Sequence, residues 1–301
     1  MIQQNVLNFT KLKSGMIVAT VFSLWFSVFF DDYVETTVSY VLIMSFGVLH
    51  GANDIRLIRS LNLNTSKSNI WKIITSYISM VLGILILFYF LPKWALCLFI
   101  LVSAYHFGEQ HWSKSVVVQS FWNTLLYSMY GLFILFMLFC IKGKQVIPIL
   151  EEVMQTSLTP VFFDYSIVII SLCLLTLGVL FFANKWVEGN LLEELFVLLV
   201  FFIIFKTASL LWGFCIYFIV WHSIPSLKDQ MDYLYGESNW KTFGRYVKDS
   251  LLYWILSIIG LMALLWFLKD SSENMISILI YFLAAITFPH VIVMSRLEKR
   301  N

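Results

Sequence analysis

The chain has 301 residues, of which 60% are hydrophobic, 18% aromatic and only 13% charged. Soluble domains carry roughly a quarter charged residues, so a water-soluble fold of this size could not bury so much apolar surface. The net charge of +2, without a basic stripe outside the loops between apolar runs, argues against nucleic acid as a partner.

Ten apolar runs are long enough, or nearly so, to cross a bilayer as helices. Crossing the hydrocarbon takes about 20 residues, and somewhat fewer where the bilayer adapts. The first run follows Lys11 and Lys13 but ends without a small-residue cleavage site, so we expect it to be retained rather than removed as a signal peptide. In chain order the runs are Met16–Phe30, Thr37–His50, Ile70–Leu91, Trp94–Phe107, Phe121–Ile141, Phe163–Phe182, Leu191–Phe205, Ala208–Trp221, Leu251–Leu268 and Met275–Met294.

The basic residues give an independent test of these runs, because Lys and Arg concentrate in short cytoplasmic loops. With the N-terminus inside, fifteen of the 20 Lys and Arg residues fall on the cytoplasmic side. No repeat or long linker divides the chain. We therefore expect an all-α, polytopic membrane helix bundle of about ten transmembrane helices, N-in and C-in, in the cell (inner) membrane, with residues 1–301 as a single integral membrane domain.

All five histidines fall near the inner ends of the predicted helices. His50 ends the second run, His106 and His111 end the fourth, His222 ends the eighth, and His290 lies in the C-terminal half of the tenth. Each of these runs proceeds from outside to inside, so the histidines come to the same leaflet. Imidazole is a common ligand of catalytic metals, and facing helices of a bundle can surround an ion. The sequence therefore predicts a metal site near the cytoplasmic ends of these helices.

Two carboxylates follow these histidines at helical spacing. Asp54 comes four residues after His50 and Glu109 three residues after His106, so each would share a helix face with its histidine and could orient or join it. His111 would lie about 140° around the helix from His106. We therefore expect His111 to lie outside the site.

Each histidine also has a purely structural explanation. A histidine at a helix end can cap carbonyl groups or lie at the membrane interface, which suits His111 beside Trp112 and Lys114. His290 follows Pro289 and could simply mark a kink in its helix. The other three are each accompanied by a small residue and another polar group, which favours a functional role.

Four short motifs occur in order along the chain, and together they resemble a known family. They are His50-Gly51-Ala52-Asn53-Asp54, Ser103-Ala104-Tyr105-His106-Phe107-Gly108, Trp221-His222-Ser223 and Phe288-Pro289-His290. On a chain of this length and hydropathy, the set resembles the Brp/Blh (bacteriorhodopsin-related protein) family of β-carotene 15,15′-dioxygenases. The motifs span residues 50 to 290, which is nearly the whole chain.

The resemblance implies a carotenoid-cleaving dioxygenase that cuts β-carotene at its central double bond with O2 and releases two molecules of all-trans-retinal. It further implies a non-haem iron, Fe(II), held by His50, His106 and His222. From their spacing, we expect Asp54 and Glu109 to lie around these ligands. The family usually has another histidine where this chain has Ser226, so His290 is the candidate for the fourth ligand. The lipid bilayer would supply the substrate, and a retinal-binding rhodopsin is the recipient that the resemblance suggests.

Several other functions compete with this interpretation. Membrane di-iron desaturases carry His-His boxes that this chain lacks, whereas a haem protein needs only axial histidines on facing helices, which the sequence permits. A transporter or carrier usually places ionisable groups near the bilayer midplane, often within an inverted repeat. We therefore keep a membrane carrier, or an inactive homologue with a structural histidine cluster, as the alternative.

Overall fold

The computed structural model describes residues 2–61, 67–118, 120–269 and 274–298, and these residues are mostly helical. Within these ranges the only β-type pairing is an isolated bridge between Val116 and Val187. The expected all-α class is confirmed.

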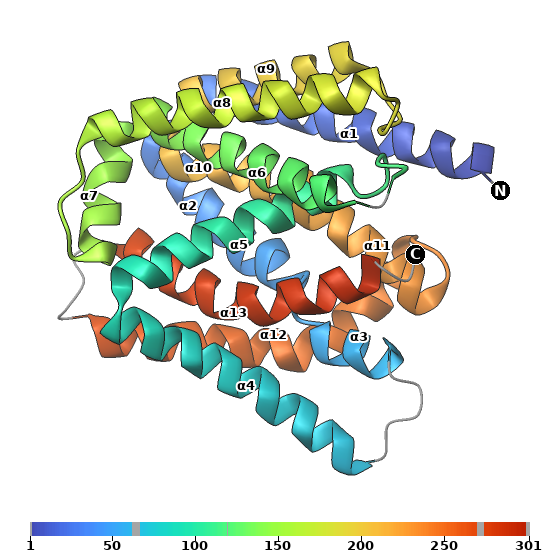
Figure 1. Ribbon diagram of the computed structural model, residues 1–301. Helices are drawn as coiled ribbons and strands as arrows, with labels where there is room; N and C mark the ends of the chain where they lie inside the picture. Colours follow the sequence, from blue (N-terminus) through green and yellow to red (C-terminus); the bar gives the residue numbers. More distant parts are fainter. Residues whose placement is uncertain (1, 62–66, 119, 270–273, 299–301) are drawn as a thin grey trace.

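The helices follow one another with short connections (Figure 1). Two of them continue directly into π-helical segments, η1 and η2, in which the helix is locally wider. In chain order the elements are α1 (Ile2–Phe29), α2 (Asp32–Leu42), η1 (Ile43–Gly47), α3 (Asp54–Leu61), α4 (Lys67–Phe90), α5 (Pro92–Trp112), α6 (Phe121–Ile141), α7 (Gly143–Met154), α8 (Pro160–Ala183), α9 (Leu191–Thr207), α10 (Leu210–Ile216), η2 (Tyr217–Ser223), α11 (Ile224–Tyr235), α12 (Trp240–Leu268) and α13 (Met275–Glu298).

Seven helical segments among the described residues are long and apolar enough to cross a membrane, rather than the ten expected. The three remaining runs are helical but fall short for different reasons. The run Thr37–His50 is split between α2 and η1, and the run Leu191–Phe205 lies in α9, which has only 17 residues. The run Trp94–Phe107 belongs to the 21-residue α5, whose last turns are polar. Apolar length alone therefore supports seven spans.

The helices stack in layers, with α13 in a central position (Figure 1). Helix α13 contacts α4, α5 and α12, whereas α6 packs against α5, and α8 and α9 pack against α6. The outer helices α4 and α12 are almost unburied along their apolar lengths, as expected for surfaces that face lipid. The buried core thus lies around α5, α10, η2 and α13.

Two glycines bring the backbones of α5 and α6 into direct contact. A Cβ added at Gly108 would lie 1.9 Å from the carbonyl oxygen of Tyr127, and one added at Gly131 would lie 1.9 Å from that of Ala104. Small residues allow such close approach of membrane helices. Because Gly108 lies two residues after His106, this contact fixes the part of α5 that carries the histidine.

Candidate metal centre

The two π-helical segments carry two of the histidines to the centre of the molecule. η1 precedes His50 by three residues, and His222 lies within η2. The segments pack against each other, and a Cβ at Gly47 would lie 2.7 Å from the ring of Phe218. Wide helical turns of this kind re-aim side chains and are frequent at functional sites.

Four histidine rings meet in one buried cluster. His106 comes from α5 and His290 from the C-terminal half of α13, and each of the four residues is at most 5% exposed. The ring centroids lie 4.8 Å apart for His50 and His290, 5.2 Å for His50 and His222, 4.7 Å for His106 and His222, and 5.2 Å for His106 and His290. The structure therefore brings together the four histidines that the sequence singled out.

Several nitrogens of these rings are buried and have no hydrogen-bond partner among the residues that the structure describes. They are Nδ1 of His50, both ring nitrogens of His106, Nδ1 of His222 and Nε2 of His290. Burying an unpaired polar atom is costly, and such atoms are usually satisfied by a partner such as an ion. Ligand atoms of His50, His222 and His290 all lie within 4.8 Å of one another, which is close enough to hold one metal ion. The donor set thus fits a metal bound by neutral imidazoles.

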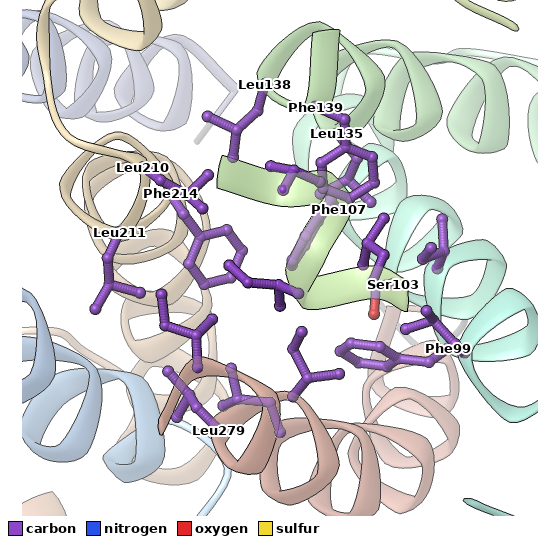
Figure 2. Close-up of a pocket in the computed structure, with 18 residues that line it drawn as sticks. Phe99, Ser103, Phe107, Leu135, Leu138, Phe139, Leu210, Leu211, Phe214 and Leu279 are labelled. Atoms are coloured by element: carbon purple, nitrogen blue, oxygen red, sulfur yellow. The ribbon is translucent and has the colours of Figure 1, made fainter. Parts of the chain in front are cut away.

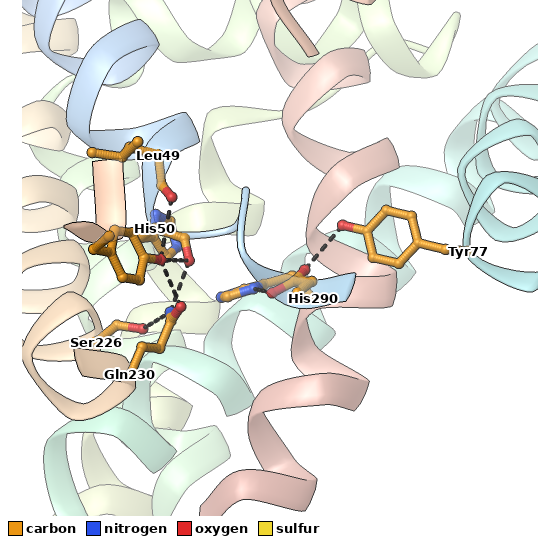
Figure 3. A network of polar contacts seen from close by, with 8 residues as sticks. Leu49, His50, Tyr77, Ser226, Gln230 and His290 are labelled. Atoms are coloured by element: carbon orange, nitrogen blue, oxygen red, sulfur yellow. Dashed lines mark hydrogen bonds and ion pairs between the residues drawn. The ribbon is translucent and has the colours of Figure 1, made fainter. Parts of the chain in front are cut away.

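A carboxylate orients one of these rings. Asp54 Oδ1 lies 2.9 Å from Nδ1 of His290, and Asp54 Oδ2 accepts a hydrogen bond of 2.9 Å from the Tyr77 hydroxyl (Figure 3). This contact leaves Nε2 of His290 directed at the cluster, which is the usual arrangement around metal-bound histidine. The helix does not run on from His50 to Asp54, since residues 50–53 form a turn and α3 begins at Asp54. Asp54 therefore pairs with His290 instead of sharing a helix face with His50.

A second polar network holds the backbone of His50. The carbonyl oxygen of His50 accepts hydrogen bonds from Gln230 Nε2 at 2.7 Å and from the Tyr246 hydroxyl at 3.2 Å (Figure 3). Gln230 also donates to the Ser226 hydroxyl at 3.1 Å and accepts from Tyr246 at 2.7 Å. Ser226 therefore belongs to the network that holds the backbone of His50. No local sequence pattern marked Tyr77, Gln230 or Tyr246, because each acts across a tertiary contact.

The remaining polar candidates lie in other networks. His111 Nε2 is 2.8 Å from Glu194 Oε2, and Lys13 Nζ donates to the other oxygen of Glu194 at 2.7 Å, so His111 joins α5 to α9 and α1. Glu109 accepts hydrogen bonds from Tyr105 at 2.5 Å and Ser295 at 3.0 Å. A role for Glu109 around a metal remains a prediction.

A cavity of about 680 Å³, here called the histidine cavity, adjoins the cluster. All four histidines line it, and mostly apolar residues of α4, α12 and α13 form much of the remaining wall, together with Phe107, Phe218 and residues between Gly47 and Ile55. Several of its lining residues are also exposed on the outside of the molecule, among them Ile78, Leu82 and Leu256. The volume is typical of a small-molecule site. The cavity therefore connects the histidines with the outer surface between α4 and α12.

Comparison with known families gives a match over most of the chain. The family model for β-carotene 15,15′-dioxygenase matches residues 41–298, a range that includes every element of the histidine cluster. No curated protein and no solved structure matches the chain.

Proposed function

Because the chain belongs to the β-carotene 15,15′-dioxygenase family, we propose that it cleaves β-carotene at its central 15,15′ double bond with O2 to give two molecules of all-trans-retinal. In this reaction the central C=C bond and the O–O bond break while two C=O bonds form. Dioxygen accepts the four electrons, so no further reductant is needed. The observation that carries the proposal is the meeting of four buried histidines, whose nitrogens lack partners among the described residues, in the wall of the histidine cavity.

His50, His106, His222 and His290 would hold the metal, which we propose to be Fe(II). Bound iron supplies the activation of O2 that an organic side chain cannot provide. Asp54 would accept a hydrogen bond from the Nδ1–H group of His290. This bond leaves Nε2 as the nitrogen of that ring that is free to bind the metal. We also propose that Glu109 helps to position the ligand His106, which lies on the same helix, α5.

The histidine cavity has the mostly apolar lining that a carotenoid requires. Its wall follows α4 from Ile74 to Leu85, a separation of eleven residue steps or about 16 Å at the helical rise. This is close to half the length of the polyene, which is roughly as long as the hydrocarbon core is thick, about 30 Å. The opening between α4 and α12 would admit the substrate directly from lipid. The position of the polyene relative to the metal then selects which double bond is cut.

The same proposal includes the membrane arrangement. We propose that α5, α9 and the α2–η1 pair cross together with the seven longer segments, which gives about ten spans with both termini in the cytoplasm. The polar end of α5 would then lie among other helices instead of lipid, as intramembrane polar groups require. The proposal places the chain in the cell membrane as a multi-pass protein, with a retinal-binding rhodopsin as the recipient of its retinal.

Expression in cells that make β-carotene tests the function. Cells with the wild-type chain should lose their yellow colour and contain retinal, whereas His106→Ala and His222→Ala should leave the colour and yield no retinal above background. Colour retained at good wild-type expression would favour the alternative, a membrane carrier or an inactive homologue. Retinal formation by the histidine variants would refute the proposed metal site.

A further inference from the structure

A second cavity lies beside the histidine cavity and plays no part in the function proposed above. It is about 120 Å³ in volume, lies among α5, α6, α7, α10 and α13, and is here called the apolar cavity (Figure 2). Among the described residues that line it, Ser103 contributes the only polar side chain, and none of their side chains is exposed. The apolar cavity therefore offers a water molecule almost no polar partner.

Two residues separate the apolar cavity from the histidines. Phe107 and Leu283 line both cavities. The ring of Phe107 also lies against the cluster, with its centroid 4.8 Å from that of His222. A small molecule in the apolar cavity is therefore one side chain away from the candidate metal ligands. It would reach them from the side of α5 and α10, whereas the histidine cavity opens between α4 and α12.

The size and polarity of the apolar cavity limit what it can hold. Water needs two or more polar partners, which a single serine cannot supply. Apolar cavities of roughly 150 Å³ stay dry and take up xenon or benzene. Half of a 40-carbon polyene needs a channel about 15 Å long and would not fit without displacing the wall. A small apolar gas is the occupant that suits this space.

We propose that the apolar cavity is a dioxygen site that supplies O2 to the histidine cluster past Phe107 and Leu283. The inference rests on the proposed function, which consumes one O2 for each polyene. It gives the two substrates separate approaches, so that a carotenoid filling the histidine cavity does not block the gas.

Filling the apolar cavity tests this assignment by steady-state kinetics. Leu279→Trp on α13 and Val146→Phe on α7 place bulk in the cavity away from the histidines. Each should raise KM for O2 by about 5-fold or more while KM for β-carotene and kcat at saturating O2 stay within about 2-fold. The matched controls are Leu172→Trp and Val179→Phe on the exposed side of α8, which should change neither constant. A rise in KM for β-carotene, or no change in KM for O2, would overturn the proposal.

Xenon binding provides a readout that does not depend on activity. In metal-free protein, crystals under xenon pressure should show a xenon atom among Leu279, Leu138 and Phe214, and Leu279→Trp should remove it. An empty cavity in the wild type would contradict the dioxygen site. If xenon binds but the wild-type protein forms no retinal, the gas site stands and the proposed reaction fails, so the two failures can be told apart.

Discussion

Asp54 is the residue whose replacement most directly tests how the cluster is held. Its carboxylate is 1% exposed and joins Nδ1 of His290 to the Tyr77 hydroxyl. Asp54→Asn removes the charge that favours the binding tautomer of His290, so we expect affinity for Fe(II) to fall about 10- to 100-fold. Tyr77→Phe removes one hydrogen bond and should cost less. Anaerobic titration with Fe(II), followed by metal analysis, measures both changes.

Asp31→Asn is the matched control for this prediction. Asp31 caps the N-terminus of α2 by accepting a hydrogen bond from Val34 N, and asparagine caps helices about equally well. The metal affinity of Asp31→Asn should equal that of the wild type. Wild-type affinity in Asp54→Asn would instead show that the Asp54–His290 contact does not orient a ligand.

His111 separates a structural histidine from the four in the cluster. It lies with Glu194 and Lys13, where it links three helices. His111→Ala should retain most retinal formation at 25 °C while lowering the free energy of unfolding by about 1–3 kcal/mol, because a partly buried carboxylate loses one partner. Activity per folded protein and a denaturation curve distinguish the two effects. Loss of activity as complete as in His222→Ala would mean that the cluster extends beyond the four rings.

At the scale of helices, the contact between α5 and α6 should be the least tolerant of added volume. A methyl group at Gly108 or Gly131 would strike backbone atoms, which cannot rotate away as a side chain does. We expect Gly131→Ala to destabilise the protein by at least about 3 kcal/mol, at the upper end of overpacking costs. Gly178→Ala on α8 is the control, since a Cβ there meets no atom within 4 Å. A thermal melt in detergent should show a large decrease in melting temperature, relative to the wild type, only for Gly131→Ala. Equal melting temperatures for the two variants would contradict the close contact.

The helices themselves could be predicted from the sequence, but their contacts could not. Apolar length identified the runs that became α4, α6, α8, α12 and α13, because crossing a bilayer sets a minimum length. Gly131 and Gly178 look alike in sequence, each alone in an apolar run, and only the approach of α5 separates them. The π-helical turns before His50 and around His222 also depend on packing between η1 and η2. A continuous helix from His50 to Asp54 was therefore the natural but wrong expectation.

At the scale of the whole molecule, the convergence of the histidines was predictable while their supports were not. The predicted direction of each run placed His50, His106, His222 and His290 near the same side of the membrane. That direction follows from the order of the spans along the chain and needs no knowledge of how the helices pack. Gln230 and Tyr246 come from α11 and α12, more than a hundred residues after the His50 carbonyl that they hold. Such partners depend on how distant helices pack against one another. A local sequence pattern does not predict that packing.

Because the four ligand candidates come from separate elements, a bound metal should stabilise the whole bundle. An ion that binds only the folded state adds RT ln(1 + [L]/Kd) to its stability, about 2.7 kcal/mol at a hundredfold excess over Kd. Removing the metal with a chelator should therefore lower the melting temperature of the wild type, and adding Fe(II) back should restore it. His290→Ala retains three histidines but loses the ring that Asp54 orients, so its melting temperature should respond much less to the chelator. An equal decrease in both proteins would show that His290 is not needed to hold the metal. No decrease in the wild type would show that the cluster is held together without metal, by packing of η1, η2, α5 and α13 alone.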